Sequence, residues 1–289
     1  ATVIFMVVNV PILRTLVYMQ VNLHVVNLIF LSLLLWRRKP FLSALALALA
    51  VHFKASPIIL VFAFILERDW RWLAWFTLNF FLIGAFSYLS HGISPFVDFV
   101  HNVLSLPASR GINFRENSFD SLFFALTTFF KADNFPTQYL IYIVKFIVGV
   151  ITLIVVAANI KHQTFYKEET RGKYLFNSIP ALLVLLTLAS PIVWVHHGVF
   201  LALAFLVILK RLSSSFQWTL YGFAYFLEFL VPTFDFFPWS YGRLLSPMII
   251  LGLLWLLPRQ QNRPSVFEAI NCWLPKINTI RDASSGEGI

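Results

Sequence analysis

The stretch TQYLIYIVKFIVGVITLIVVAANI, residues 137–160, decides the fold class of this chain. It carries one charged residue, Lys145, and it exceeds the roughly 20 residues that an α-helix needs to cross a bilayer. Other apolar stretches recur along the 289 residues. The sequence therefore predicts a polytopic membrane protein.

The composition agrees with this interpretation. Hydrophobic residues make up 59% of the chain, charged residues 12%, and the mean hydropathy is +0.77, which lies outside the range of soluble globular domains. We expect an all-α transmembrane helical bundle of about nine or ten membrane segments, including short or re-entrant helices. The candidate helices lie at 22–36, 41–53, 57–66, 73–89, 137–160, 175–189, 198–209, 216–231 and 241–257.

Basic residues are concentrated in every second connection between these helices, at 37–39, 68–71, 161–173, 210–211 and 259–263. Since cytoplasmic loops carry an excess of Lys and Arg, we place these connections in the cytoplasm. The external face then receives residues 20–22, 54–57, 90–136, 190–197 and 232–240. The sequence thus predicts a multi-pass protein of the cytoplasmic (inner) membrane.

One part of this topology has an alternative. Residues 41–66 form either a hairpin of two short helices or a single tilted helix kinked at Pro57. We prefer the hairpin, because a single crossing would place the basic connection at 161–173 outside.

Residues 1–263 are expected to form one transmembrane domain of catalytic type, with an external segment at 90–136. Within that segment, residues 96–104 resemble a short helix at the interface with membrane lipids, and 119–130 are apolar but too short to span. Residues 264–289 are predicted to be a polar cytoplasmic tail.

The net charge of +9 does not indicate nucleic-acid binding, because the basic residues are scattered through short loops rather than gathered on one face. The single Cys272 provides neither a disulfide nor a cysteine metal site within the chain.

The motif SPIVWVHH at 190–197 places His196 and His197 between two apolar stretches. Polar groups so close to the membrane interior are energetically unfavourable and commonly have a function. Adjacent residues on a helix point about 100° apart, so the two imidazoles do not form an i, i+4 metal pair. An imidazolium would suit a phosphorylated substrate, and a neutral imidazole could accept a proton. The alternative is an interface histidine pair beside an anchoring Trp194.

Two of the few basic residues expected on the external face, Lys54 and Arg115, are candidate site residues. Lys54, three residues before Pro57, is a candidate phosphate partner or a side chain that reaches the lipid headgroups. Arg115 lies in the polar run at 113–118. The carboxylate of Glu228, deep in the 216–231 helix, is costly unless it is paired.

An ordered set of motifs resembles glycosyltransferase family 87. The motifs are QVN at 20–22, RRKP at 37–40, HFKASP at 52–57, ERDWRW at 67–72, ENS at 116–118 and SPIVWVHH at 190–197. This family comprises C-type membrane enzymes that transfer sugars, typically mannose, from polyprenyl-phosphate donors. Family members typically show GQxN, KxxP, NxS and SPxxWxHH. Here Met19 replaces the glycine, Glu116 an asparagine, and Val195 stands where an aspartate is often found.

The resemblance implies transfer of a hexose, with mannose favoured, to a lipid or glycan acceptor. The acceptor hydroxyl attacks the anomeric carbon and the lipid phosphate leaves. His196 and His197 are the candidates for a catalytic role. The residues implied in substrate binding are Gln20, Asn22, Lys54, Arg115, Glu116, Asn117, Ser118 and Trp194.

No cofactor is implied with certainty, and assistance by a divalent metal stays open. Members of this class carry their catalytic acidic residue, which acts as the general base, in the first external loop. The present chain opens with ATVIFMVVNVP without an initiator methionine. We therefore expect the general base to lie upstream of residue 1. The alternative functions are a non-enzymatic transporter or flippase for a lipid-linked or anionic substrate, and an inactive scaffold subunit.

Overall fold

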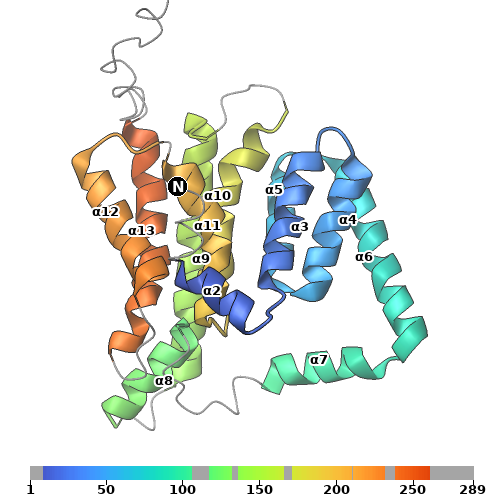
Figure 1. The fold of residues 1–289 in the computed structure, drawn as a ribbon, viewed down its shortest axis with the longest axis horizontal. Coiled ribbons are helices and arrows are strands. Elements are labelled where there is room, and N and C mark those ends of the chain that lie inside the picture. Colours follow the sequence, from blue (N-terminus) through green and yellow to red (C-terminus); the bar gives the residue numbers. More distant parts are fainter. Residues whose placement is uncertain are drawn as a thin grey trace, which may run out of the picture.

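The computed structural model describes residues 9–105, 117–131, 136–165, 171–209, 211–231 and 238–260. Within these ranges all regular secondary structure is helical, which confirms the all-α prediction (Figure 1). The first half contains α2 (Val10–Val17), α3 (Asn22–Leu35), α4 (Pro40–Phe53), η1 (Ser56–Leu60), α5 (Val61–Leu66), α6 (Trp70–His91) and α7 (Ser94–Ser105). The second half contains α8 (Phe119–Phe129), α9 (Thr137–His162), α10 (Lys173–Leu188), η2 (Val195–Phe200), α11 (Leu201–Leu209), α12 (Ser215–Tyr225), η3 (Phe226–Leu230), η4 (Trp239–Tyr241), α13 (Gly242–Leu256) and η5 (Leu257–Gln260).

The number of membrane segments differs from the prediction. Among the described helices, α6 and α9 are long and apolar enough to cross a membrane, and α2 with α3, which meet at 116°, would make a third. The other predicted segments, apart from 216–231, are apolar helices of 10–17 residues, shortened by breaks in the chain such as those before Pro57 and Pro191. The predicted count of nine or ten is therefore not confirmed.

The outer surfaces of α6 and α9 are apolar. Phe81, Phe86 and Leu89 of α6, and Phe146 and Ile151 of α9, are all exposed. Continuous apolar faces of this size are unfavourable in water and suit contact with lipid chains. The chain is therefore a membrane protein by both the composition and the placement of its apolar side chains.

Two hydrogen bonds show how α3 to α6 are arranged. At the end of α3, Trp36 Nε1 donates to Asp69 at 2.8 Å, and near its start, Lys54 Nζ donates to Asn22 Oδ1 at 3.3 Å. Because Lys54 ends α4 and Asp69 precedes α6, the chain must turn back after Lys54. This is the predicted hairpin rather than the single kinked helix.

The basic connections gather at one end of the bundle. Arg171 donates to Asp69 at 2.9 Å and Arg37 donates to the Arg171 carbonyl group. Glu67 accepts backbone N–H groups from Gly172 and Tyr174 at the start of α10. The end with Asp69 and Arg171 is called the basic end below, and the opposite end is called the Lys54 end.

The helices α7 and α8 lie across the Lys54 end (Figure 1). α7 covers the predicted interfacial segment and exposes Phe96, Val97 and Val100. α8 begins after Ser118, whose hydroxyl accepts the N–H of Ser121 at 3.2 Å, and its Asp120 pairs with Lys145 of α9.

The short helix α2 has no counterpart in the sequence predictions. Asn9 Oδ1 caps it by accepting the N–H of Ile12 at 3.0 Å, and Pro11 follows within the first turn. Between α2 and α3 the chain turns at Met19, whose φ of 49° lies in the left-handed region. α2 therefore folds against η2 instead of continuing the direction of α3.

The predicted tail at 264–289 lies outside the described residues, as do Arg115 and Glu116. The domain boundary at 263 stays a prediction.

Candidate functional site

The histidine motif forms a tight turn that follows α10 and includes the first residues of η2. The N–H of Trp194 donates to Nδ1 of His197 at 3.0 Å, and the N–H of His197 donates to the Trp194 carbonyl oxygen at 2.8 Å. Because Nδ1 accepts a hydrogen bond, the neutral ring of His197 carries its proton on Nε2. The N–H of Asn117 adds a bond of 2.7 Å to the Val193 carbonyl oxygen. This turn, residues 190–198, is therefore held from several sides.

Lys54 reaches the same turn from the hairpin. It ends α4 in an extended conformation, since the proline at 57 starts a new helical segment rather than prolonging α4. Its Nζ lies 3.3 Å from Asn22 Oδ1 and 5.1 Å from the ring centre of Phe200. The Asn22 amide in turn donates to the His196 carbonyl oxygen at 3.4 Å. Three segments distant in sequence thus meet at one point.

A cavity of about 1310 Å³ lies at this meeting point, called the large cavity below. Five residues expected from the sequence line it: Gln20, Lys54, Trp194, His196 and His197. Its apolar wall includes Ile58, Phe99 of α7 and Leu186. Among the described lining residues none is Asp or Glu, so the cavity favours an anion.

Arg14 and Tyr18 also line the large cavity and were not expected from the sequence as site residues. Arg14 Nη1 donates to the Tyr18 hydroxyl at 2.8 Å, and the Tyr18 and His196 rings meet edge to face with centres 6.4 Å apart. A signal was present, because Arg14 is one of few basic residues outside the basic connections. Its proximity to the histidines depends on α2 folding against η2, which the sequence pattern does not reveal.

Burial lowers the pKa of three groups of the large cavity, Lys54, His196 and His197, and so favours their neutral forms. It lowers the pKa of Lys54 to about 7. Burial and then the charge of Lys54 lower the pKa of His196 to about 4, and the same causes hold the pKa of His197 well below its usual value. The imidazoles are therefore neutral at pH 7, unlike the imidazolium considered from the sequence. Positive charge comes from Arg14 and the protonated fraction of Lys54.

The other expected residues are placed differently. Asn22 forms hydrogen bonds to the Lys54 side chain and to the His196 carbonyl oxygen. Ser118 is buried as the cap of α8. Asn117 does not line the large cavity. Arg115 and Glu116 lie outside the described residues.

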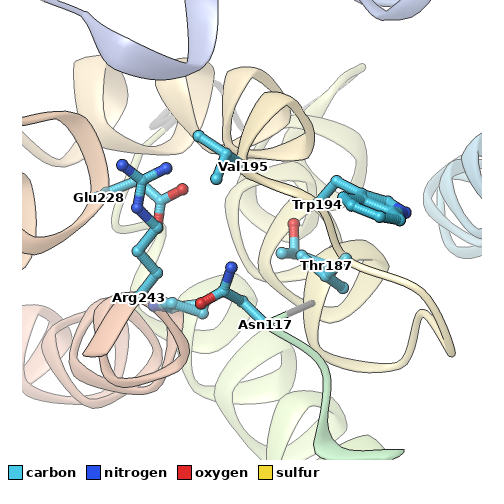
Figure 2. A pocket seen from close by; sticks show the side chains of 8 residues that line it. Asn117, Thr187, Trp194, Val195, Glu228 and Arg243 are labelled. Carbon is cyan, nitrogen blue, oxygen red and sulfur yellow. The ribbon is translucent and has the colours of Figure 1, made fainter. Parts of the chain in front are cut away.

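Asn117 faces a second, small cavity of about 10 Å³ on the other side of the histidine turn. Figure 2 shows the guanidinium group of Arg243 beside the carboxylate of Glu228, with the Asn117 amide facing the same space. Trp194 and Val195 line both cavities. Glu228, expected to need a partner, thus lies next to an arginine.

In the part of the chain that the structure describes, no three His, Cys, Asp or Glu side chains are grouped so that they could hold a metal ion. The described site therefore offers cations and neutral imidazoles to a ligand.

A family comparison covers the first part of this site and ends before Trp194, His196 and His197. The model of glycosyltransferase family 87 matches residues 1–191. The matched region includes Arg14, Lys54 and the start of the histidine turn. No curated protein and no solved structure matches the chain.

Proposed function

Because the chain belongs to glycosyltransferase family 87, we propose that it transfers a hexose, with mannose favoured, from a polyprenyl-phosphate donor to a lipid or glycan acceptor. The proposed site is the large cavity, and the proposed location is the external face of the cytoplasmic membrane. The enzyme would be a multi-pass protein that takes its donor from the surrounding lipid.

One observation carries the proposal: Arg14 and Lys54 line a cavity without a described carboxylate and with an apolar wall. A lipid phosphate needs cations for its head and apolar contacts for its chain. The apolar residues Ile58 and Phe99 are exposed and lie on that wall. The cavity therefore matches both parts of such a donor.

The chemistry follows from this placement. The acceptor oxygen forms a bond to the anomeric carbon while the bond from that carbon to the phosphate oxygen breaks, and the lipid phosphate leaves with the electron pair. Arg14 and protonated Lys54 stabilise the charge that develops on this oxygen. The neutral imidazoles of His196 and His197 hydrogen-bond to the phosphate or the acceptor. The acceptor proton passes to a general base that the proposal does not assign to a cavity residue.

The test uses membranes that contain the full-length protein, radiolabelled polyprenyl-phosphate mannose and a membrane-lipid acceptor. Arg14→Met and the double variant His196→Ala, His197→Ala are compared with the reference protein. Arg38→Met is the matched control, because Arg38 is exposed and follows α3 at the basic end. We expect labelled product with the reference and with Arg38→Met, and little with the other two variants.

Transfer by the reference protein that does not exceed that of the double histidine variant would refute the proposal. Movement of the labelled donor across the membrane without product formation would instead favour the transporter or flippase alternative.

A further inference from the structure

The histidine turn has a polar interior on the side away from the large cavity. Three side chains there are almost fully buried: Asn117 and Glu228 are 4% exposed and Arg243 is 6% exposed. They come from three separate elements, namely the start of α8, the π-helical turn η3 and the first turn of α13. Burial of such groups is costly unless their polar atoms are paired.

Several of these polar atoms have no hydrogen-bond partner among the described residues. They are Nδ2 and Oδ1 of Asn117 and Nε and Nη1 of Arg243. The remaining guanidinium nitrogen, Nη2, donates to the Val231 carbonyl oxygen. Leaving a buried polar group unpaired is unfavourable, so a ligand that pairs these atoms would be bound firmly.

The small cavity between them sets the size of that ligand. Its volume of about 10 Å³ is close to the space that one water molecule needs, and a buried water requires two to four polar partners. Asn117 and Arg243 supply donors and an acceptor on its wall. The cavity therefore fits one water and excludes a sugar.

The contact between Glu228 and the turn depends on Gly198. A Cβ atom at this position would lie 2.0 Å from Glu228 Oε1 and 3.0 Å from Pro11 Cγ. The carboxylate therefore packs directly against the backbone next to His197. The π-helical turn at Phe226–Leu230 brings Glu228 to this point, as such turns often do for functional side chains.

We propose that Asn117, Glu228 and Arg243, joined by one buried water, form a polar brace. This brace holds the histidine turn in place on the side away from the large cavity. They are positioning residues, since Trp194 and Val195 separate them from the large cavity. The brace keeps Trp194, His196 and His197 facing that cavity. Its importance for sugar transfer rests on the proposed function, but its effect on the turn can be measured without transfer.

The experiment reports the position of the turn through a single cysteine. Cys272→Ser removes the natural cysteine and Ser190→Cys places one on the wall of the large cavity. The rate of labelling by N-ethylmaleimide in membranes is then compared for Gly198→Ala and Gly222→Ala in this background. Gly222→Ala is the matched control, because a Cβ at Gly222 of α12 would meet nothing within 4 Å.

We expect Gly198→Ala to change the labelling rate about tenfold, which corresponds to about 1.4 kcal/mol in the opening of the turn, and Gly222→Ala to leave it unchanged. A second pair of variants tests the charges. Glu228→Gln alone leaves Arg243 charged and buried, whereas Glu228→Gln with Arg243→Gln removes both charges. The double variant should therefore label closer to the reference rate than the single one.

Donor kinetics separate positioning from general damage. A displaced turn should raise the KM for polyprenyl-phosphate mannose more than it lowers kcat. Equal labelling rates for Gly198→Ala and Gly222→Ala would contradict the proposed brace. Loss of sugar transfer in Gly198→Ala with an unchanged labelling rate would also contradict it. If the reference protein transfers no sugar, the proposed function fails while the labelling rates still decide the brace.

Discussion

The Nζ atom of Lys54 lies 3.3 Å from Oδ1 of Asn22, and the amide nitrogen of the same Asn22 lies 3.4 Å from the His196 carbonyl oxygen. One buried asparagine therefore connects the hairpin cation to the histidine turn. Asn22 belongs to α3, so the relative position of these two groups depends on the start of that helix.

Replacing Asn22 tests this connection. Asn22→Leu keeps a similar volume but removes both hydrogen bonds, so Lys54 is no longer directed toward the donor. A hydrogen bond to a charged group contributes about 1.5–3 kcal/mol, and we expect a rise of about tenfold or more in the KM for polyprenyl-phosphate mannose. Asn22→Ser, which retains an acceptor, should lose less. Equal KM values for Asn22→Leu and the reference would contradict this role.

The pH dependence of donor binding should follow Lys54. Its pKa is lowered to about 7, so the free protein loses this positive charge as the pH rises through about 7. Donor affinity is therefore expected to be highest below this pH and to fall above it. Measurement of kcat/KM from pH 6 to 9 checks the direction.

Two variants identify the titrating group. Asn22→Asp places a negative charge beside Lys54, which raises its pKa and moves the fall in kcat/KM to higher pH. Lys54→Arg keeps a charged side chain over the whole range, so its profile should be flatter. An unchanged profile in both variants would show that another group is responsible.

Met19 should be a site of gained stability. Its φ of 49° costs a non-glycine residue roughly 1–2 kcal/mol, and its side chain is 92% exposed, so little packing is lost on removal. We expect Met19→Gly to raise the thermal unfolding temperature in detergent. Met19→Ala keeps the unfavourable backbone conformation and serves as the control. A gain of equal size in both variants would show that the side chain rather than the backbone matters.

Asp69 should stabilise the basic end in a pH-dependent way. Burial opposes its ionisation, but hydrogen bonds from Arg171 and Trp36 outweigh burial and lower its pKa. Its contribution is therefore present above the pKa of the unfolded chain, about 3.9, and is lost as the pH falls through the lower folded value. Asp69→Asn should reduce the unfolding temperature at pH 7, and the difference should shrink toward pH 3. A difference that is constant with pH would exclude the ionised carboxylate as its cause.

The helices were the most predictable part of the fold. The run at 137–160 became α9, and the break near Pro57 became a hairpin, because apolar length and proline act locally. The proximity of Lys54 to His196 and His197 was partly predictable, because the predicted topology placed all three residues on the same face of the membrane. The number of spans was not, because apolar composition does not set where a helix breaks.

The contacts that the sequence did not predict join residues that are far apart along the chain. Arg14 lines the large cavity because α2 and α3 meet at 116°, and no pattern in residues 9–22 encodes that angle. Arg243 of α13 lies beside Glu228, which belongs to the π-helical turn η3 (Figure 2). The positions of Arg14 and Arg243 in the sequence therefore do not predict which groups they contact.

The start of α10 has no acidic residue of its own and uses Glu67, which accepts the N–H groups of Gly172, Tyr174 and Leu175. The other end of this helix, about 24 Å away by its length, carries Leu186 to the cavity wall and continues into the histidine turn. α10 is therefore a strut between the two ends of the bundle. One helix therefore joins Glu67 at the basic end to the histidine turn at the Lys54 end, and side chains of other elements hold both of its ends.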